Sequence, residues 1–312
     1  MIVKCQYFDK KAKPMTNLGD LRLNRLELIH SLFSLRGTYP NLFSSYVHFI
    51  HNAMDILINF KNLGGVLAIK PLPADSYDGF KRNSDFYGAA LTVLISRKKY
   101  GNSFTIPITQ QMLSIPGGTR CDFVAIDRAN NYSLFESKSS ITNVNKKVHL
   151  AKAIKQLNSM GPINAFGSTP TRFTKKIAVL TSFRQNNVRA GHIGTKCDIF
   201  DPEEEGNNVL TINLNDELKR YYSFFQKKEF NNEEVLLFDG KKILCSKIII
   251  NYQFEFTVGL LEDIYKIINS EEKQKDILKS IMQSTIDDDT HIDDGILFSD
   301  GIFLSSKYLN NQ

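Results

Sequence analysis

The feature that most constrains this chain is a pair of apolar runs, residues 121–127 and 132–138, separated by a short turn. The runs "CDFVAID" and "YSLFESK" are rich in aromatic and β-branched residues, which favour strands, and the "RANN" between them favours a turn. Together they predict a β-hairpin. Three polar residues lie at one end of this predicted hairpin, although apolar strands do not require them there: Asp122, Glu136 and Lys138.

A helix and a weaker strand precede the hairpin. Residues 84–99 have a helical pattern, with Ser84 as a capping residue, basic residues in the last turn and Gly101 just beyond, an arrangement that the helix dipole favours. Residues 102–112 are a weaker strand candidate, because Pro107 restricts them to a sheet edge or a bulge. The hairpin is therefore expected to belong to a larger sheet.

A second helix and a buried strand follow the hairpin. Residues 145–160 have helical spacing and end at Gly161 and Pro162. Residues 175–183 are a continuous apolar run, which is typical of a buried strand. The order helix, strand, strand, strand, helix, strand predicts an α/β unit with a mixed β-sheet flanked by helices over roughly residues 84–183.

The rest of the chain is predicted to add elements at both ends. Residues 18–35 and 41–62 have helical spacing, and residues 63–79 predict a short strand followed by a loop, so we expect residues 1–83 to form a mainly helical region packed on the core. The core itself is expected over 84–200, with a soft boundary because no low-complexity linker ends it. Residues 201–312 predict an acidic α+β region that regulates the core or docks a partner.

The elements expected after the core are less regular. The stretch 184–208 is predicted to be rich in loops. Beyond it we expect a strand and a helix, then a hairpin that turns at Asp239 and Gly240, and helical structure over 255–283. The acidic run 287–294 does not match a calcium-binding loop, so it is interpreted as a solvated or partner-facing segment.

The net charge of +6 conceals an uneven distribution. Residues 1–200 hold 27 Lys and Arg against 11 Asp and Glu, a net of +16, whereas residues 201–312 hold 12 against 22, a net of −10. The basic part suits a polyanion such as DNA, and the acidic part suits a role toward a partner protein. A chance distribution of charge is the alternative.

Composition excludes several classes of protein. The 312 residues are 42% hydrophobic and 23% charged, as in ordinary globular proteins, and no apolar run is long enough to span a membrane. The N-terminus does not resemble a secretory signal. The four cysteines include no CxxC pair, which argues against a structural zinc site and favours reduced thiols in a cytoplasmic protein. No GxxxxGK[ST] motif for an ATPase is visible.

Strand geometry is expected to bring the polar residues of the hairpin together. Side chains alternate along a strand, so Glu136 and Lys138 share a face, and the turn returns Asp122 to a position beside Glu136. Two neighbouring carboxylates repel unless a cation lies between them, and their oxygens suit Mg²⁺ or Mn²⁺. Lys138 would then lie beside the attacking water and the phosphate. The alternative is an ion pair at a solvated hairpin end.

The stretch "CDFVAIDRANNYSLFESK", set in this order of elements, resembles the PD-(D/E)xK nuclease superfamily, which includes many restriction endonucleases, resolvases and exonucleases. The resemblance covers about a third of the chain and implies a restriction-endonuclease-like fold. It implies that Asp122, Glu136 and Lys138 are catalytic, and that Asp122, Glu136 and the main-chain carbonyl of Ser137 hold Mg²⁺ or Mn²⁺. Cys121 stands where the family name has Pro.

The same resemblance assigns auxiliary residues. Asp85 corresponds to an acid that some members carry on the helix before the sheet, with a partner of the helix dipole as its alternative. Gln156 corresponds to a Gln of exonuclease-like members, although no Tyr follows it at helical spacing. Lys152 and Lys155 on the same helix, together with Arg120, are candidates for binding DNA phosphates, and ordinary surface positions are the alternative for the lysines.

The resemblance implies a metal-dependent nuclease that cuts DNA. Compact nucleases without a motor resemble effector subunits of bacterial restriction or anti-phage defence systems, in which a helicase, ATPase or sensor controls cutting. The Glu-Ser-Lys element is also similar to that of the nuclease subunit of Hachiman-type defence systems. A catalytically silent DNA-binding or scaffolding subunit and a general interaction protein are the alternatives. The sequence leaves the oligomeric state open, a homo-oligomer included.

Overall fold

The computed structural model describes residues 1–9, 19–35, 42–69, 77–115, 119–140, 146–165, 169–184, 193–202, 206–226, 230, 234–250, 254–270 and 277–308. The chain divides into two compact units. The first comprises Met1–Thr38 and His48–Asn213, and the second comprises Tyr39–Val47 and Leu214–Gln312. By sequence the first unit holds 27 Lys and Arg against 15 Asp and Glu, a net of +12, and the second holds 12 against 18, a net of −6. The uneven charge therefore follows the division into units.

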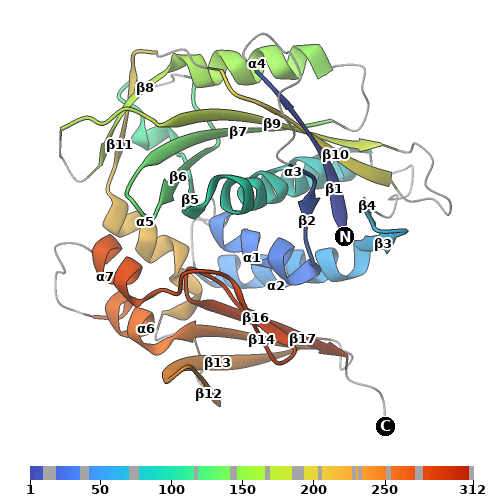
Figure 1. Ribbon diagram of the computed structural model, residues 1–312, viewed down its shortest axis with the longest axis vertical. Coiled ribbons are helices and arrows are strands. Elements are labelled where there is room, and N and C mark those ends of the chain that lie inside the picture. Colours follow the sequence, from blue (N-terminus) through green and yellow to red (C-terminus); the bar gives the residue numbers. More distant parts are fainter. Residues whose placement is uncertain are drawn as a thin grey trace. The chain divides into compact units, whose positions relative to one another are not determined.

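The first unit is built around a mixed sheet of nine strands (Figure 1). Its strands are β1 (Ile2–Phe8), β2 (Leu21–Arg22), β3 (Phe60–Leu63), β4 (Val66–Ile69), β5 (Asn102–Pro107), β6 (Phe123–Asp127), β7 (Tyr132–Ser140), β9 (Lys175–Arg184) and β10 (Ile193–Phe200). The order across the sheet is β2-β1-β4-β10-β9-β7-β6-β5, with β3 paired to β4. Strand β5, which contains Pro107, lies at the edge, as the sequence predicts.

Helices and a smaller sheet complete this unit. The helices are α1 (Arg25–Leu35), α3 (Tyr77–Tyr100), α4 (Lys146–Ser159) and, from His48 onward, α2 (Leu42–Asn59), with a short 3₁₀ helix η3 (Gln110–Met112). Strands β8 (Met160–Ala165) and β11 (Asn208–Ile212) pair in parallel as a separate two-stranded sheet. The predicted order of helix, three strands, helix and strand over residues 84–183 is present as α3, β5, β6, β7, α4 and β9.

The hairpin of β6 and β7 closes through side-chain hydrogen bonds. The Oδ1 atom of Asp127 accepts the main-chain N–H groups of Ala129 and Asn131, each at 2.8 Å. Asn130 has a φ of 62°, a left-handed conformation that Asn tolerates better than most residues. These contacts fix the antiparallel register in which Phe123 lies opposite Phe135.

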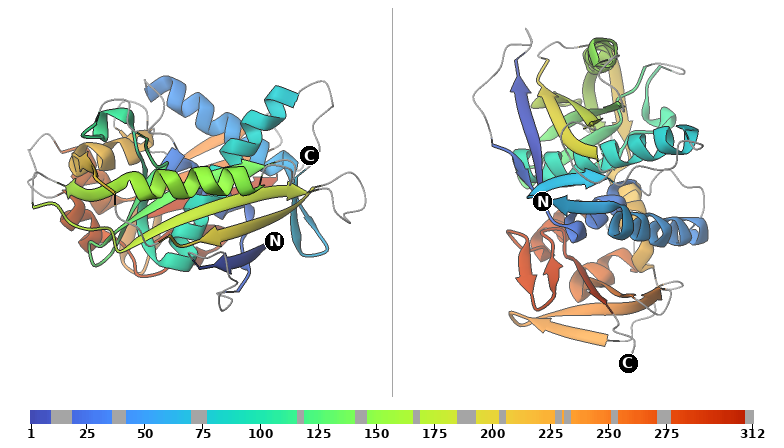
Figure 2. Two further views of the ribbon diagram at one scale, coloured as in Figure 1. Left: turned by 90° about the horizontal axis from the view of Figure 1, so that it is seen from above. Right: turned by 90° about the vertical axis from the view of Figure 1, so that its right-hand side faces the viewer.

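Helices α3 and α4 cover opposite faces of the sheet (Figure 1). Strands β7 and β9 are parallel and are connected through α4, which runs along both of them when seen from above (Figure 2). On the other face, Gly88 of α3 comes so close that an added Cβ would lie 3.0 Å from the Cβ of Ser139. Odd-numbered residues at this end of β7 therefore face α3, and even-numbered residues face α4.

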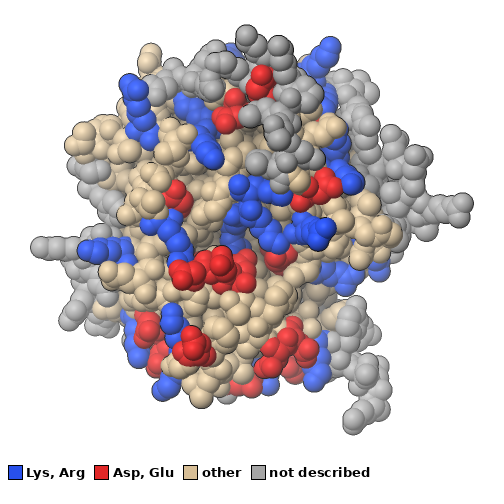
Figure 3. Space-filling model, in the orientation of Figure 1, with Lys and Arg blue, Asp and Glu red and all other residues tan. Residues whose placement is uncertain are grey.

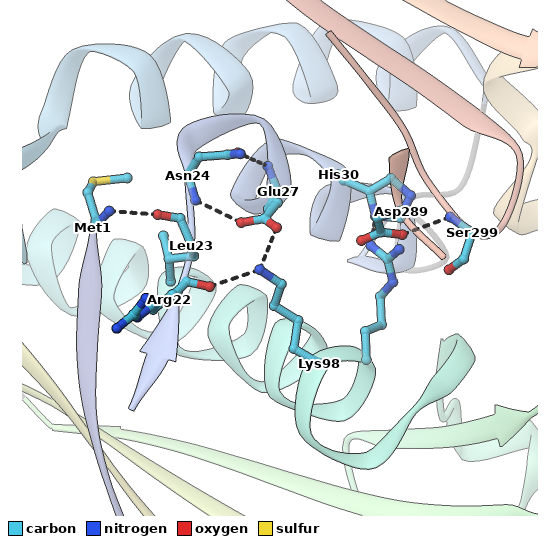
Figure 4. A network of polar contacts seen from close by, with 10 residues as sticks. Met1, Arg22, Leu23, Asn24, Glu27, His30, Lys98, Asp289 and Ser299 are labelled. Atoms are coloured by element: carbon cyan, nitrogen blue, oxygen red, sulfur yellow. Dashed lines mark hydrogen bonds and ion pairs between the residues drawn. The ribbon is translucent and has the colours of Figure 1, made fainter. Parts of the chain in front are cut away.

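The N-terminal segment is tied to α3 by a polar network (Figure 4). Asn24 and Glu27 form a capping box at the start of α1, in which each side chain accepts the other residue's main-chain N–H, at 2.9 and 2.7 Å. Lys98 of α3 binds Glu27 at 2.5 Å and the carbonyl of Arg22 at 2.8 Å. Basic side chains gather on this face of the unit (Figure 3). The first residues thus belong to the same unit as the sheet.

The second unit contains an antiparallel sheet of six strands in the order β12-β13-β14-β17-β16-β15. The strands are β12 (Glu234–Phe238), β13 (Lys241–Ile250), β14 (Phe254–Leu261), β15 (Thr290–Ile292), β16 (Gly295–Leu297) and β17 (Ile302–Tyr308). The helices are α5 (Leu214–Tyr221), α6 (Glu262–Ile268) and α7 (Ile277–Ser284), with a 3₁₀ helix η5 (Ser223–Phe225). The predicted hairpin is present, and Asp239 and Gly240 form its turn with φ angles of 46° and 74°.

Four sequence predictions about the fold are wrong. The helical region 1–83 was not expected to contain β1, which pairs with β10 in the main sheet, although the short strand predicted over 63–79 is present as β4. Ser84 does not cap its helix, because α3 begins at Tyr77. The stretch 184–208, predicted to be rich in loops, contains β10 itself. Helical structure was expected from residue 255, but β14 is a strand up to Leu261. Most residues of β14 are buried on whichever face of the sheet they lie, so the sequence lacks the alternation of apolar and polar residues that marks a half-exposed strand.

The class of the protein is mixed α/β, as expected. Among the described residues, no helix is both long enough and apolar enough to cross a membrane.

Candidate active site

Asp122 and Glu136 are linked across the hairpin by two hydrogen bonds, each from a main-chain N–H of one arm to a carboxylate of the other. The main-chain N–H of Asp122 donates to Oε2 of Glu136 at 3.0 Å, and the main-chain N–H of Ser137 donates to Oδ2 of Asp122 at 2.8 Å. Each carboxylate is thus oriented by a main-chain donor of the opposite arm. The predicted proximity of the two acids is present, because the register of the hairpin brings Asp122 beside Glu136.

Lys138 lies on the same face of β7 and contacts Glu136 directly. Its Nζ atom donates to Oε1 of Glu136 in a short ion pair. The Glu136 side chain is 0% exposed and that of Lys138 is 21% exposed. The alternative of an ion pair at a solvated hairpin end is therefore wrong, since such a pair would leave both groups in water.

Burial makes both carboxylates hard to ionise. It raises the pKa of Glu136 from its ordinary value of 4.5 to about 8, and the neighbouring charge of Asp122 adds to the rise, while Lys138 opposes it. Burial also raises the pKa of Asp122, against the positive charge of Lys138 and the hydrogen bond from Ser137. An added cation would be stabilised beside these two neighbouring acids, of which Glu136 is fully buried and Asp122 half-buried.

Gln156 reaches this end of the hairpin from α4. Its Nε2 atom donates to the carbonyl of Arg120 at 2.6 Å, two residues before Asp122. The guanidinium of Arg120 donates to the carbonyl of Ile108 at 3.3 Å, and the main-chain N–H of Ile108 donates to the carbonyl of Asp122 at 2.8 Å. Gln156 and Arg120 are therefore brought to the acidic pair, and the contact of Gln156 is to the main chain.

Lys152 and Lys155 lie on the exposed part of α4. Both are exposed, whereas Ala153 and Leu157 of the same helix are buried. Lys152 precedes Gln156 by one helical turn, so the two project from the same side of the helix. The predicted phosphate-binding lysines are thus accessible, and among the described residues no contact joins them to the acidic pair.

Asp85 is not brought together with the acidic pair. It is exposed and accepts a short hydrogen bond from the Oγ atom of Ser139. Ser139 faces α3, whereas Glu136 and Lys138 point to the opposite face of β7. The prediction of Asp85 as an auxiliary member of the site is therefore not supported by its position.

Lys176 is a buried cation near the site that the sequence analysis missed. It precedes Ala178, which lies opposite Glu136 in the ladder of β7 and β9, and its Nζ atom donates to the carbonyl of Met160 at 2.6 Å. Burial raises the pKa of the neighbouring Cys121 well above its usual range, with Glu136 and Asp122 adding to the rise and Lys176 opposing it. The sequence signal that could have identified Lys176 was a lysine within the predicted buried strand 175–183.

The donor set fits a hard divalent cation better than a softer metal. Within the described part of the chain, no group of three or more His, Cys, Asp or Glu side chains could hold a metal ion. Mg²⁺, however, keeps several waters and is commonly bound through one or two carboxylates. Asp122 and Glu136 provide that number on a rigid hairpin.

Comparison with known proteins identifies no relative of this chain. No protein-family model matches it, and no curated protein or solved structure matches it either.

Proposed function

We propose that this chain is a Mg²⁺- or Mn²⁺-dependent nuclease of the PD-(D/E)xK type that hydrolyses phosphodiester bonds in DNA. The observation that carries the proposal is the pair of buried Glu136 and half-buried Asp122, hydrogen-bonded across the hairpin, with Lys138 on the same face as Glu136. The order of α3, β5, β6, β7, α4 and β9 supports a restriction-endonuclease-like core. A functional site also accounts for a fully buried Glu136 beside a second acid at a strand end, which stability alone does not favour.

A polyanionic substrate is supported by charge. The unit that contains the site has a net of +12 from 27 basic and 15 acidic residues. Lys152, Lys155 and the guanidinium of Arg120 would bind phosphates on either side of the one that is cut, as charge-assisted hydrogen bonds allow. Their sequence-independent contacts fix the position of the backbone and do not read bases.

The carboxylates of Asp122 and Glu136, with the main-chain carbonyl of Ser137, would hold the cation. When bound, the ion supplies Lewis-acid stabilisation of the phosphate and a more acidic water. Lys138 is partly exposed, with 21% of its side chain accessible, whereas Glu136 is fully buried. Its Nζ atom would orient the attacking water and neutralise the charge that develops on the phosphoryl oxygens. Gln156 would keep the segment before Asp122 in place through the carbonyl of Arg120.

A silent nuclease-like subunit that binds DNA or serves as a scaffold is the second candidate. The short ion pair between Lys138 and Glu136 favours it, because this contact already neutralises one carboxylate within the protein. A partner that controls cutting, such as a helicase, an ATPase or a sensor, is part of our proposal for the active form, and a role in bacterial restriction or anti-phage defence follows from the same family resemblance.

The test is cleavage of supercoiled and linear DNA by the purified chain in Mg²⁺ or Mn²⁺. We expect Glu136→Ala and Lys138→Ala to lower the rate by at least about 10²-fold, the loss typical of removing a group that stabilises charge in the transition state. The matched control is the exposed pair of the second unit, so Glu234→Ala and Lys247→Ala should cut at the wild-type rate. Equal cutting by all forms would refute the assignment of the site. Absence of cutting with retained Mg²⁺ binding would indicate a nuclease that awaits its controlling partner, and absence of both cutting and Mg²⁺ binding would favour the silent subunit.

A further inference from the structure

Two of the four cysteines lie opposite each other in the main sheet. Strands β1 and β10 are parallel neighbours, and their register pairs Cys5 with Cys197. Neighbouring strands lie about 4.7–4.9 Å apart, which is within the range of roughly 4.4–6.8 Å that a disulfide requires between Cα atoms. The backbone thus holds the two residues at a separation that a disulfide accepts.

The two thiols lie on the same face of the sheet and interact with each other. Cys5 also donates to the carbonyl of Val3 at 3.6 Å, and Cys197 lies 3.5 Å from the hydroxyl of Thr181. Thr181 faces α3 beside Gly88, so the thiols lie on the α3 face of the sheet. Cys5 is 3% exposed and Cys197 is 0% exposed. The other cysteines, Cys121 and Cys245, are buried in other elements.

The surroundings favour the thiolate on Cys5. The hydrogen bond from Cys197 lowers the pKa of Cys5, and Lys99 lowers it further, while burial and Asp20 act in the opposite direction. The main-chain N–H of Cys5 donates to Oδ1 of Asp20 at 3.2 Å, and Lys99 donates to the carbonyl of Asp20 at 3.1 Å. The more acidic thiol is therefore on the strand nearer the edge of the sheet.

Strand β1 has a short ladder on its outer side. It pairs with β10 over five residues from Lys4 to Phe8. On the other side, within the described residues, it pairs with the two residues of β2 and, at Ile2, with β4, and the side chain of Asp20 accepts the main-chain N–H of Cys5. An N-terminal strand with so short an outer ladder opens locally at a lower free energy than a central strand, which gives a small oxidant access to Cys5.

We propose that Cys5 and Cys197 are a redox pair that forms a reversible disulfide with a small-molecule disulfide as oxidant. The Cys5 thiolate attacks one sulfur of the oxidant and releases its other half as a thiol. The Cys197 thiolate then attacks the Cys5 sulfur and releases the second half. Two S–H bonds of the protein are replaced by one S–S bond, and two electrons and two protons pass to the oxidant.

The bond would fasten β1 to β10 and close a loop that contains almost the whole first unit. Long closed loops restrict the unfolded chain most, so the oxidised protein should unfold at a higher temperature. The thiols lie on the α3 face, whereas Glu136 and Lys138 point to the other face. The inference is thus independent of the proposed nuclease function.

The test uses the full chain incubated with oxidised glutathione, followed by alkylation, digestion without reduction and mass spectrometry. We expect a peptide pair that links Cys5 to Cys197 and disappears with dithiothreitol, and a midpoint of thermal unfolding several degrees above that of the reduced protein. Cys245→Ser should keep the link. Cys197→Ser should leave glutathione attached to Cys5, because the second attack is lost.

Two results would overturn the proposal. In the first, Cys5 and Cys197 are both alkylated after incubation, even in urea just below the unfolding transition, where β1 opens. In the second, Cys5 is linked to Cys121 or Cys245 instead, which shows that contact in the folded sheet does not select the partner.

Discussion

Two hairpins of this chain carry the same kind of ion pair in opposite surroundings. In β6 and β7, Glu136 and Lys138 have side chains that are 0% and 21% exposed. In β12 and β13, Glu234 and Lys247 lie 3.0 Å apart with side chains that are 39% and 40% exposed. The residue types are alike, but Glu136 and Lys138 are two residues apart on one strand, whereas Glu234 and Lys247 lie on neighbouring strands. The two pairs also differ in burial and in the second acid, Asp122, beside Glu136.

The comparison distinguishes a solvent-exposed ion pair from an ion pair whose surroundings raise the pKa of its acid. Water screens the exposed pair, which contributes at most about 1 kcal/mol to stability. The buried pair lies where a carboxylate cannot remain charged without compensation, and the pKa of Glu136 rises to about 8. The same two residue types are thus structural in one hairpin and poised for proton or cation exchange in the other.

The largest expected effect is on how the free energy of unfolding changes with pH when divalent metal is absent. The folded-state pKa of Glu136 lies above the unfolded value, so the folded protein binds the extra proton, and stability is lost as pH rises from about 4.5 toward 8. We expect the wild type to lose roughly 4 kcal/mol of unfolding free energy between pH 5 and 9 through this group. Glu136→Gln should lack this loss in urea titrations with EDTA.

The matched variant Glu234→Gln should retain the wild-type pH dependence. If the free energies of unfolding of Glu136→Gln and the wild type changed with pH in the same way, Glu136 would ionise normally. The contrast between the two hairpins would then disappear.

The next effect is stabilisation by metal. If Mg²⁺ binds the folded chain and not the unfolded one, free ion at a hundred times its dissociation constant should add about 2.7 kcal/mol to the unfolding free energy. The gain should vanish in Glu136→Gln and persist in Glu234→Gln, as measured by unfolding with and without Mg²⁺ at constant ionic strength. An equal gain in both variants would place the cation elsewhere.

Removing the lysine should have a smaller effect. Lys138→Met leaves Glu136 buried without its cation, but the carboxyl escapes most of the penalty by keeping its proton. We therefore expect a loss of about 1–2 kcal/mol at pH 9, compared with less than about 1 kcal/mol for Lys247→Met. Equal losses in the two hairpins, measured by urea unfolding at pH 9, would contradict the difference in burial.

The comparison also shows what the sequence could predict. Both hairpins were predictable, because their turn residues and apolar arms are local signals. The proximity of Asp122 and Glu136 followed from the register that the turn imposes. Local pattern was therefore sufficient wherever one short turn determined the geometry.

Long-range packing was not predictable in the same way. The polar residues of β10 suggested a loop, yet Asp198 is buried and pairs with Lys146 of α4 and with Lys196. Asp85 was chosen as the acid of the helix before the sheet, but the close packing of Gly88 on Ser139 sets which side of α3 meets the sheet. Both outcomes depend on contacts between elements that are distant in the sequence.

The smallest effects should come from the two turns, which are held by different means. The turn of β6 and β7 depends on the Asp127 carboxylate, so Asp127→Ala should cost about 1 kcal/mol and Asp127→Asn less, because Oδ1 is retained. The turn of β12 and β13 depends on backbone freedom. Gly240 has a φ of 74°, and a Cβ there would meet no atom within 4 Å.

Gly240→Ala should therefore also cost about 1 kcal/mol, through backbone strain alone, and Gly240→Asn should cost less because Asn tolerates a positive φ. Urea unfolding of the four variants separates the two mechanisms. If Asp127→Asn were as costly as Asp127→Ala, the carboxylate charge rather than its geometry would hold the first turn. The turn of the hairpin would then depend on an ionised acid, in contrast to its other end, where the pKa values of Asp122 and Glu136 are raised.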